Sequence, residues 1–227
     1  MFGKRLINTG GVACTTDTLQ ILGDTSCIAT YRLNGDATDL SGNYNGTATS
    51  VTYVTGKFGD AGSFNGSAKI TLSGLNTFFT PKVNTSVSLW AKSSAGLGYI
   101  FSDEVFTFTN NYNLIIQYSG DGKLYLSTSY GGTASNFGTT ETFNDNNWHH
   151  IVAIINQSTN TGSLYVDESF KGSYTLPASA KVGTPYTVIG TVGNNYAPYN
   201  GSIDQVRIFN KAISPSELTT IYNEVAC

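Results

Sequence analysis

Apolar positions recur with strand spacing along most of this chain, and the pattern is clearest from Asn147 to Asp167. A turn-rich segment, Asn156 to Gly162, interrupts the pattern, which then resumes. A two-residue period broken by a turn is typical of a β-hairpin. Its apolar face requires a second sheet to cover it and consists of Ile151, Ala153 and Ile155.

Short strands with turns between them are predicted from Ile28 onward. The segment from Tyr130 to Gly138 is predicted to be a loop, because it is rich in Gly, Ser and Asn. The strands are expected at Ile28 to Leu33, Val51 to Val54, Ala68 to Leu72, Thr85 to Lys92, Tyr99 to Ser102, Val105 to Thr109, Asn113 to Tyr118, Lys123 to Ser127, Thr139 to Phe143, Ser169 to Leu176, Tyr186 to Ile189 and Ser202 to Phe209. Strands without helices between them predict an all-β fold, a two-sheet antiparallel jelly-roll sandwich.

One short C-terminal helix is expected to close the chain. Ser214 followed by Pro215 and Glu217 forms a capping-box pattern, which predicts a helix from Pro215 to Asn223. Its apolar positions fall at helical spacing and would pack it on the sandwich: Leu218, Ile221 and Tyr222.

The chain divides into an N-terminal arm and one large domain. Residues 1–27 lack sustained periodicity and are predicted to be an extended arm, which lies on the domain or docks on a partner. Residues 28–227 carry the regular pattern and are predicted to form the jelly-roll domain.

The amino-acid composition limits the classes of partner that the protein is expected to bind. The chain is 40% hydrophobic but only 12% charged, its net charge is -3, and its lysines and arginines are scattered. A basic patch is therefore missing, which argues against nucleic acid and anionic membranes as partners. No apolar run approaches the ~20 residues of a membrane span, and the start lacks the apolar region of a signal peptide, so neither is expected.

Three cysteines give an odd count: Cys14, Cys27 and Cys227. A disulfide between Cys14 and Cys27 would close a small loop, whereas three thiols would suit a reducing compartment. Cys227 is also a candidate for joining two chains.

Catalytic patterns are not found, so the protein is predicted not to be an enzyme. His149 and His150 are adjacent in a strand and point to opposite faces, so one is expected at the sheet surface and the other packed. Asp103 and Glu104 are opposed for the same reason, and a glycosidase needs two carboxylates across one groove. Nucleophile-elbow, P-loop and dinucleotide motifs are missing as well.

Aromatic residues in Gly- and Asn-rich segments are the candidate ligand contacts. Such rings would stack on a sugar, with neighbouring amides bonding its hydroxyls, or would contact a protein. Packing between loops is the alternative. The candidates are Tyr130, Phe137, Asn194, Asn195, Tyr196 and Tyr199.

Several motifs together resemble a known family. ATYRLNGDATDLSGN, GKFGDAGSFNGSAKITL, SVSLWAK, NNWHHIVAIINQSTNTGSLYVDE and GSIDQVRIFNKAISPSEL follow one another between Ile28 and Asn223. This series resembles the concanavalin A-like, laminin-G-like jelly-roll domains. Asp167-Glu168 replaces the family's usual Asp-Gly, so a less tight turn is expected there.

The resemblance also implies a calcium ion at a sheet edge. Asp36, Asp39 and Asn43 share one loop, and Asp204 follows a Gly-Ser-Ile segment that the family places close to the N-terminal strand. Such oxygen ligands suit Ca²⁺. Alternatively, Asp36 and Asp39 cap turns, and Asp204 pairs with Arg207 or Arg32.

Two functions from different classes are expected. The first is a bacteriophage or other virion structural protein, a capsid decoration, head fibre or tail component assembled in the host cytoplasm. Residues 1–27 would bind other virion proteins, and the jelly roll would bind host glycans or form a homo-oligomer. The alternative is a free bacterial carbohydrate-binding module or adhesin, extracellular or at the cell surface. A small glycosidase is the third hypothesis.

Overall fold

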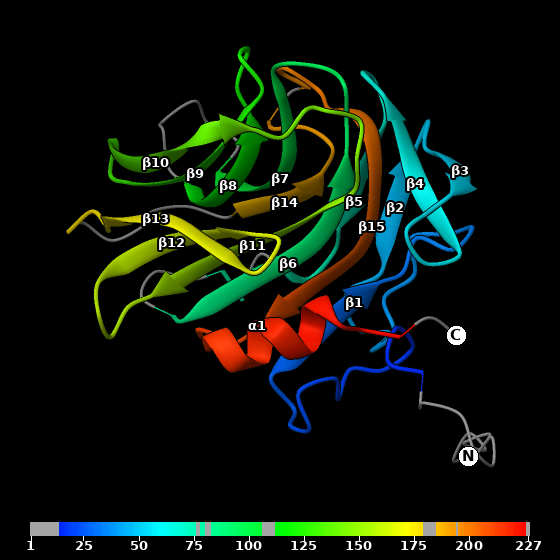
Figure 1. Cartoon of the computed structure of the whole chain (residues 1–227), viewed down its shortest axis with the longest axis horizontal. Helices are drawn as coiled ribbons and strands as arrows, with labels where there is room; N and C mark the ends of the chain where they lie inside the picture. Colours follow the sequence, from blue (N-terminus) through cyan, green and yellow to red (C-terminus); the bar gives the residue numbers. More distant parts are fainter. Residues whose placement is uncertain are drawn as a thin grey trace.

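Two antiparallel sheets packed face to face form the domain, with one short helix outside them (Figure 1). The computed structural model describes residues 14–75, 78–79, 83–105, 112–178, 185–193 and 195–225. The predicted all-β jelly-roll sandwich with a C-terminal helix is confirmed. No helix among these residues is long and apolar enough to cross a membrane.

The larger sheet has eight strands. Their order is β13 (Ser169–Thr175), β12 (Thr161–Val166), β11 (His149–Asn156), β6 (Thr85–Lys92), β15 (Asn200–Phe209), β4 (Asp60–Asn65) and β3 (Thr52–Thr55), with β1 (Cys27–Tyr31) paired to β15. Strands far apart in the chain, such as β6 and β15, are therefore neighbours.

The smaller sheet has seven strands. Their order is β10 (Thr133–Thr142), β9 (Lys123–Tyr130), β8 (Tyr112–Tyr118), β7 (Gly98–Val105), β14 (Pro185–Ile189), β5 (Lys69–Leu72) and β2 (Gly46–Thr49).

The predicted hairpin is the pair β11 and β12, and its apolar face lies in the core between the sheets. The alternate residues Val152 and Ile154 point to the outer face, where they pack against α1 (Pro215–Tyr222). Since both faces of β11 are buried, its apolar run is continuous. In Figure 1, helix α1 lies beside the end of β15 and next to β1.

The capping box of α1 is confirmed. The Ser214 hydroxyl accepts a hydrogen bond from the Glu217 amide, and the Glu217 carboxylate accepts one from the Ser214 amide at 2.8 Å. Leu218 and Ile221 are the buried residues of the helix, which ends at Tyr222 with Asn223 as its C-cap.

The predicted loop from Tyr130 to Gly138 is wrong. Strand β9 continues to Tyr130 and β10 begins at Thr133, so only Gly131 and Gly132 connect them. Both glycines have positive φ (58° and 82°), as a tight hairpin turn requires. Their small, polar neighbours lie on an edge strand, where sequence composition does not distinguish a strand from a loop.

The turn at Asp167 and Glu168 is tight, contrary to the expectation. It has two residues, both with positive φ (49° and 62°). The Asp167 carboxylate accepts a hydrogen bond from the His150 amide at 2.8 Å, which holds the turn without a glycine.

Further differences concern strands. Strands β2 and β4 were not predicted, and β7 is a single strand to Val105. The rest of the strand predicted from Val105 to Thr109 lies outside the described residues.

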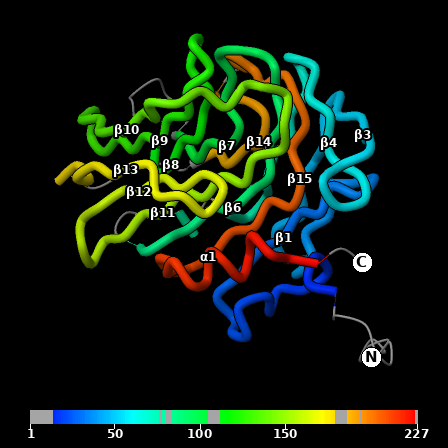
Figure 2. Tube along the Cα trace, in the orientation of Figure 1, coloured from blue at the N-terminus to red at the C-terminus, as the bar shows by residue number. Residues whose placement is uncertain are grey.

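Residues 14–26 lie on the outer face of the larger sheet, beside the end of the chain. The amides of Thr15 and Thr16 donate hydrogen bonds to the Val225 carbonyl (3.0 and 3.2 Å), so the two described ends meet (Figure 2). Ile21 packs in the cluster under α1. Cys27 is a buried free thiol, which excludes a Cys14–Cys27 disulfide. Cys14 is nevertheless disulfide-bonded, so the expectation of three free thiols is wrong. Cys227 lies outside the described residues.

Candidate functional site

A cavity of about 580 Å³ lies on the face of the smaller sheet that points away from the core. Leu114 and Ile116 of β8 face the core, whereas the alternate residues Ile115 and Gln117 face the cavity. We call this cavity the tyrosine pocket. Strands β7, β8 and β9 contribute Tyr99, Glu104, Tyr112, Ile115, Gln117 and Ser127, and the loop before β15 contributes Val192, Gly193, Asn195 and Tyr196.

The loop that closes one side of the pocket is tied to the start of β7. The Tyr99 amide donates a hydrogen bond to the Ala197 carbonyl (3.1 Å), and the Tyr196 amide donates one to the Val192 carbonyl (3.1 Å). The rings of Tyr99 and Tyr196 therefore lie 6.2 Å apart, centroid to centroid. The Tyr196 side chain is 66% exposed, so one of its faces is open to a ligand.

Glu104 is the only ionisable carboxyl among the described lining residues. Its Oε2 atom is buried and has no hydrogen-bond partner. Burial raises the pKa of this carboxyl above its ordinary value. Burial also raises the pKa values of Tyr99 and Tyr112, and proximity to Glu104 adds to both shifts, so both phenols keep their protons.

Asp103 and Glu104 are opposed, as the strand pattern predicted. Asp103 is buried away from the pocket and accepts a hydrogen bond from Thr187 Oγ1 at 3.2 Å. The two carboxyls therefore do not face a common groove.

The residues predicted to contact a ligand lie in different parts of the structure. Tyr196 and Asn195 line the pocket, and Asn195 Oδ1 accepts a hydrogen bond from Lys69 Nζ at 3.0 Å. Phe137 is half-buried in β10 against Gly172 of β13, away from the pocket. Asn194 lies outside the described residues.

The expectation that Tyr130 and Tyr199 are exposed is wrong. Each is 1% exposed. Tyr130 donates a hydrogen bond to Asn113 Oδ1 (2.9 Å), and Tyr199 donates one to the Lys92 carbonyl (2.9 Å). Glycine-rich neighbours suggested open loops, but these rings fill space in the interior and cannot reach a ligand.

Sequence reasoning missed Tyr99, Tyr112 and Gln117. All three lie in or next to predicted strands, and the alternation of β8 places Gln117 on the face opposite Leu114 and Ile116. That alternation could have identified one polar face, but not the loop that closes it.

The residues proposed for calcium do not form one ligand set. Asp36 caps its own turn by accepting a hydrogen bond from the Thr38 amide at 2.9 Å. Asp39 is buried and accepts hydrogen bonds from the Thr30 amide (2.9 Å) and the Ser41 hydroxyl. Asn43 bonds within this loop through its backbone amide, which donates a hydrogen bond to Ser41 Oγ at 3.1 Å.

Asp204 lies under a different turn. Its Oδ2 atom accepts a hydrogen bond from the Phe58 amide at 2.9 Å, its Oδ1 has no partner, and burial raises its pKa to about 7. The alternative pairings with Arg207 or Arg32 are wrong. No group of three or more His, Cys, Asp and Glu in the described part of the chain is arranged to hold a metal, and calcium binding stays a prediction.

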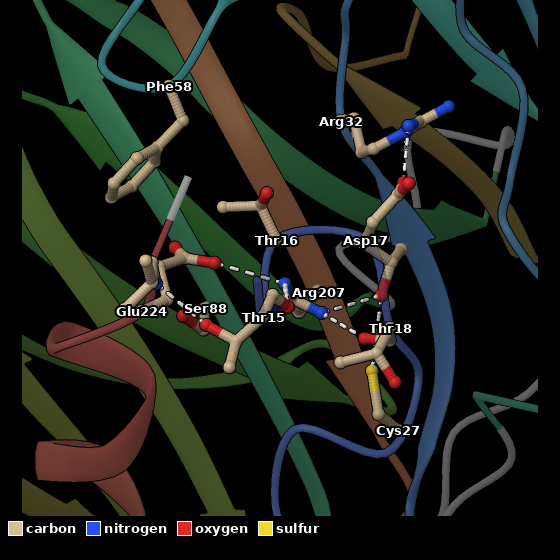
Figure 3. Close-up of polar contacts among 12 residues, drawn as sticks. Thr15, Thr16, Asp17, Thr18, Cys27, Arg32, Phe58, Ser88, Arg207 and Glu224 are labelled. Atoms are coloured by element: carbon tan, nitrogen blue, oxygen red, sulfur yellow. Dashed lines mark hydrogen bonds and ion pairs between the residues drawn. The ribbon is translucent and has the colours of Figure 1, made fainter. Parts of the chain in front are cut away.

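A second polar cluster surrounds Arg207 on the outer face of the larger sheet (Figure 3). The guanidinium donates hydrogen bonds to the carbonyls of Thr15 (3.0 Å) and Thr18 (2.8 Å) and pairs with Glu224 at 3.0 Å. Trp90 Nε1 donates to the same carboxylate at 3.2 Å. All of these contacts lie within the chain, so the cluster joins the N-terminal segment to the C-terminal end.

The histidine prediction is confirmed. His149 lies at the sheet surface between Asp167 (2.7 Å) and Asp145 (3.0 Å), which raise its pKa against the effect of burial. His150 is buried beside Trp90, and burial lowers its pKa to about 3.

The family comparison agrees with this architecture. The model of Laminin_G_3, the Concanavalin A-like lectin/glucanases superfamily, matches residues 64–219, more than half of the chain. No curated protein sequence matches significantly.

Solved structures share the fold. Domain 4 of AbnA, a GH43 extracellular arabinanase from Geobacillus stearothermophilus, was solved in complex with arabinotriose and has a TM-score of 0.70 at 23% identity, covering 87% of this chain and 98% of that one. The binding domain of Paraclostridial Mosquitocidal Protein 1 has a TM-score of 0.68 at 19% identity, covering 87% and 52%. The binding domain of botulinum neurotoxin serotype G has a TM-score of 0.67 at 14% identity, covering 86% and 50%. This chain thus spans about half the length of each toxin domain, and the likeness is one of fold.

Proposed function

Because the chain belongs to the concanavalin A-like lectin/glucanases superfamily, we propose that it is a non-enzymatic carbohydrate-binding domain that takes its ligand into the tyrosine pocket. The observation that carries this proposal is the lining of the pocket. Three tyrosine rings line one cavity together with the side chains of Glu104, Gln117 and Ser127. Aromatic rings stack on the apolar faces of sugars, and the polar groups bond sugar hydroxyls.

Size and openness support the proposal. A cavity of about 580 Å³ falls within the range of small-molecule sites. Tyr196 is exposed at its edge, so a longer glycan has a surface to continue along. The arabinotriose bound to domain 4 of the arabinanase, which shares this fold, supports the ligand class.

A single carboxyl in the pocket favours binding over hydrolysis. Glycosidases generally use two carboxylates on either side of the scissile bond. Glu104 has no second carboxyl facing it among the described lining residues, and Asp103 is buried elsewhere. The other described lining groups are phenols, amides, a hydroxyl and apolar side chains, and none of them is a second carboxyl.

The direct test is a glycan array probed with the full chain, followed by calorimetry on the glycans that bind. Replacement Tyr196→Ala is expected to weaken binding at least tenfold, which corresponds to about 1.4 kcal/mol. Phe170→Ala is the matched control, because Phe170 is also an exposed ring (55%) but lies on β13 of the other sheet. An array without any bound glycan, or equal losses in both variants, would contradict the proposal.

The virion role is a finer proposal that rests on the sequence. The sequence assigns the contacts with other virion proteins or further copies of the chain to residues 1–27, of which residues 14–26 lie on the domain. If the arm has this role, removing residues 1–13 should abolish assembly without unfolding the domain. Residues 14–26 must stay, because Arg207 bonds Thr15 and Thr18. Light scattering of both forms checks this: two monomers of normal stability would contradict an assembly role and favour a free module or adhesin.

A further inference from the structure

Glu104 is enclosed by tyrosines. In the strand register it lies opposite Tyr112 of β8 and Tyr186 of β14, and Tyr99 lies at the start of its own strand. Its carboxylate extends toward the loop, since a Cβ atom on Gly193 would lie 3.3 Å from Glu104 Oε2. The carboxyl thus lies between aromatic rings and a backbone turn.

Among the described residues, the Glu104 carboxyl has no cationic partner. No lysine or arginine is among the described residues that line the pocket. Lys69 on β5 is the cation bonded to a lining residue, and its ammonium bonds Asn195. The pocket therefore has acidic character without an internal counter-charge, which is expensive for a partly buried carboxylate.

A positively charged ligand group would relieve this cost. An ammonium forms a charge-assisted hydrogen bond with a carboxylate, and tyrosine rings attract cations to their faces. An anionic sugar would instead be repelled by Glu104, and a neutral sugar would gain only hydroxyl hydrogen bonds. The arrangement of one carboxyl among three rings favours a cation over both.

We propose that the tyrosine pocket prefers glycans with a free ammonium group, amino sugars that are not N-acetylated, and seats that ammonium between Glu104 and the tyrosine rings. This proposal rests on the proposed carbohydrate-binding function and names the sugar class. N-acetylation removes the charge and adds bulk, so the acetylated sugar is the matched ligand for comparison.

Calorimetry with three probes tests the proposal: a glucosamine trisaccharide, the N-acetylglucosamine trisaccharide and a galacturonic acid trisaccharide, at a pH where the amine is protonated. The glucosamine trisaccharide is expected to bind at least tenfold more tightly than its acetylated form, and the acidic one more weakly still. Added salt should reduce the preference, because it screens the charge pair.

Variants identify the group responsible. Glu104→Gln is expected to bring the ratio of the two glucosamine affinities to about one, because the neutral amide cannot form the charge-assisted bond. Glu168→Gln is the control, since it removes the same charge from an exposed turn on the other sheet. It should leave the ratio unchanged.

The outcomes separate the two proposals. If neutral glycans bind through Tyr196 but the glucosamine ratio is near one, or survives Glu104→Gln, the ammonium proposal is overturned and the carbohydrate function stands. Equal binding of a tri-lysine peptide would overturn the choice of a glycan. If no glycan of any charge binds, both proposals fail.

Discussion

Glu224 is a buried carboxylic acid in the segment after α1, and Glu104 is a partly buried one on β7 of the smaller sheet; their surroundings differ. Glu224 has a buried arginine and a tryptophan N–H as partners, and every contact comes from the chain itself. Glu104 has tyrosine rings around it, but its buried oxygen has no partner. Burial raises the pKa of both carboxyls, but only Glu224 has an opposing interaction with a cation.

The difference indicates two roles. Both carboxylate oxygens of Glu224 accept hydrogen bonds from within the chain, and the bonds of its partner Arg207 join residues 14–26 to the chain end. The buried Oε2 atom of Glu104 has no hydrogen-bond partner within the described chain and is free to bond a ligand. A buried polar group without a partner is costly, so its presence in an open pocket is a reason to assign that pocket to a ligand.

The largest effect is expected from Arg207→Met, which leaves Glu224 buried without a cationic partner. Removing one partner of a buried ion pair typically costs about 3–5 kcal/mol in unfolding free energy. Urea denaturation measures the loss. Arg32→Met is the control, because Arg32 pairs with Asp17 at the surface, where such pairs contribute up to about 1 kcal/mol. Similar losses in both variants would contradict the role assigned to the Arg207 cluster.

A second effect concerns pH and His150, which lies beside Trp90 and Tyr222 next to this cluster. Its pKa is about 3 in the folded protein, against an ordinary value of 6.5. Between these values the unfolded chain binds a proton that the folded chain does not, so the stability contribution of neutral His150 is lost as the pH falls from 6.5 toward 3.

His150→Asn isolates this contribution from those of other groups, such as His149, whose raised pKa acts in the opposite direction. The quantity to follow is the unfolding free energy of the natural protein minus that of the variant. It should decrease by up to about 1.4 kcal/mol for each unit by which the pH is lowered within this window. Urea denaturation at several pH values measures the difference. A difference that stays constant with pH would show that His150 does not stay neutral.

The smallest effect is expected from Glu104→Gln, which should change the unfolding free energy by at most about 0.5 kcal/mol, because no partner is lost. Glu224→Gln is its counterpart and should cost about 1–3 kcal/mol, since it weakens the bonds of Arg207 and Trp90. Thermal and urea denaturation of both variants check this. Equal losses would remove the distinction between the two carboxyls.

Much of the fold could be predicted because its signals are local. Strand β6 has the predicted bounds, Thr85–Lys92, and the capping box places the start of α1. The wrong predictions occur where one local sequence pattern is compatible with two different structures. Gly131 and Gly132 made a region look like a loop, although they form only the turn between two strands.

The site could be predicted only in part. Tyr196 and Asn195 were recognised in their loop, but Tyr130 and Tyr199 have similar neighbours and are buried. Whether a tyrosine in such a segment is buried depends on which distant strands pack against it. The residue types within a few positions of the tyrosine do not specify those strands.

Local sequence was sufficient to predict the strand period, the apolar face of the β11–β12 hairpin, the helix cap and the opposition of Asp103 and Glu104, since each follows from backbone geometry over a few residues. The position of Glu104 among Tyr99, Tyr112 and Tyr196, and the pairing of Arg207 with Glu224, are known only from the folded chain. Both sets are assembled by pairing between strands and by segments distant in the chain, so the charge balance of each site depends on contacts that only folding creates.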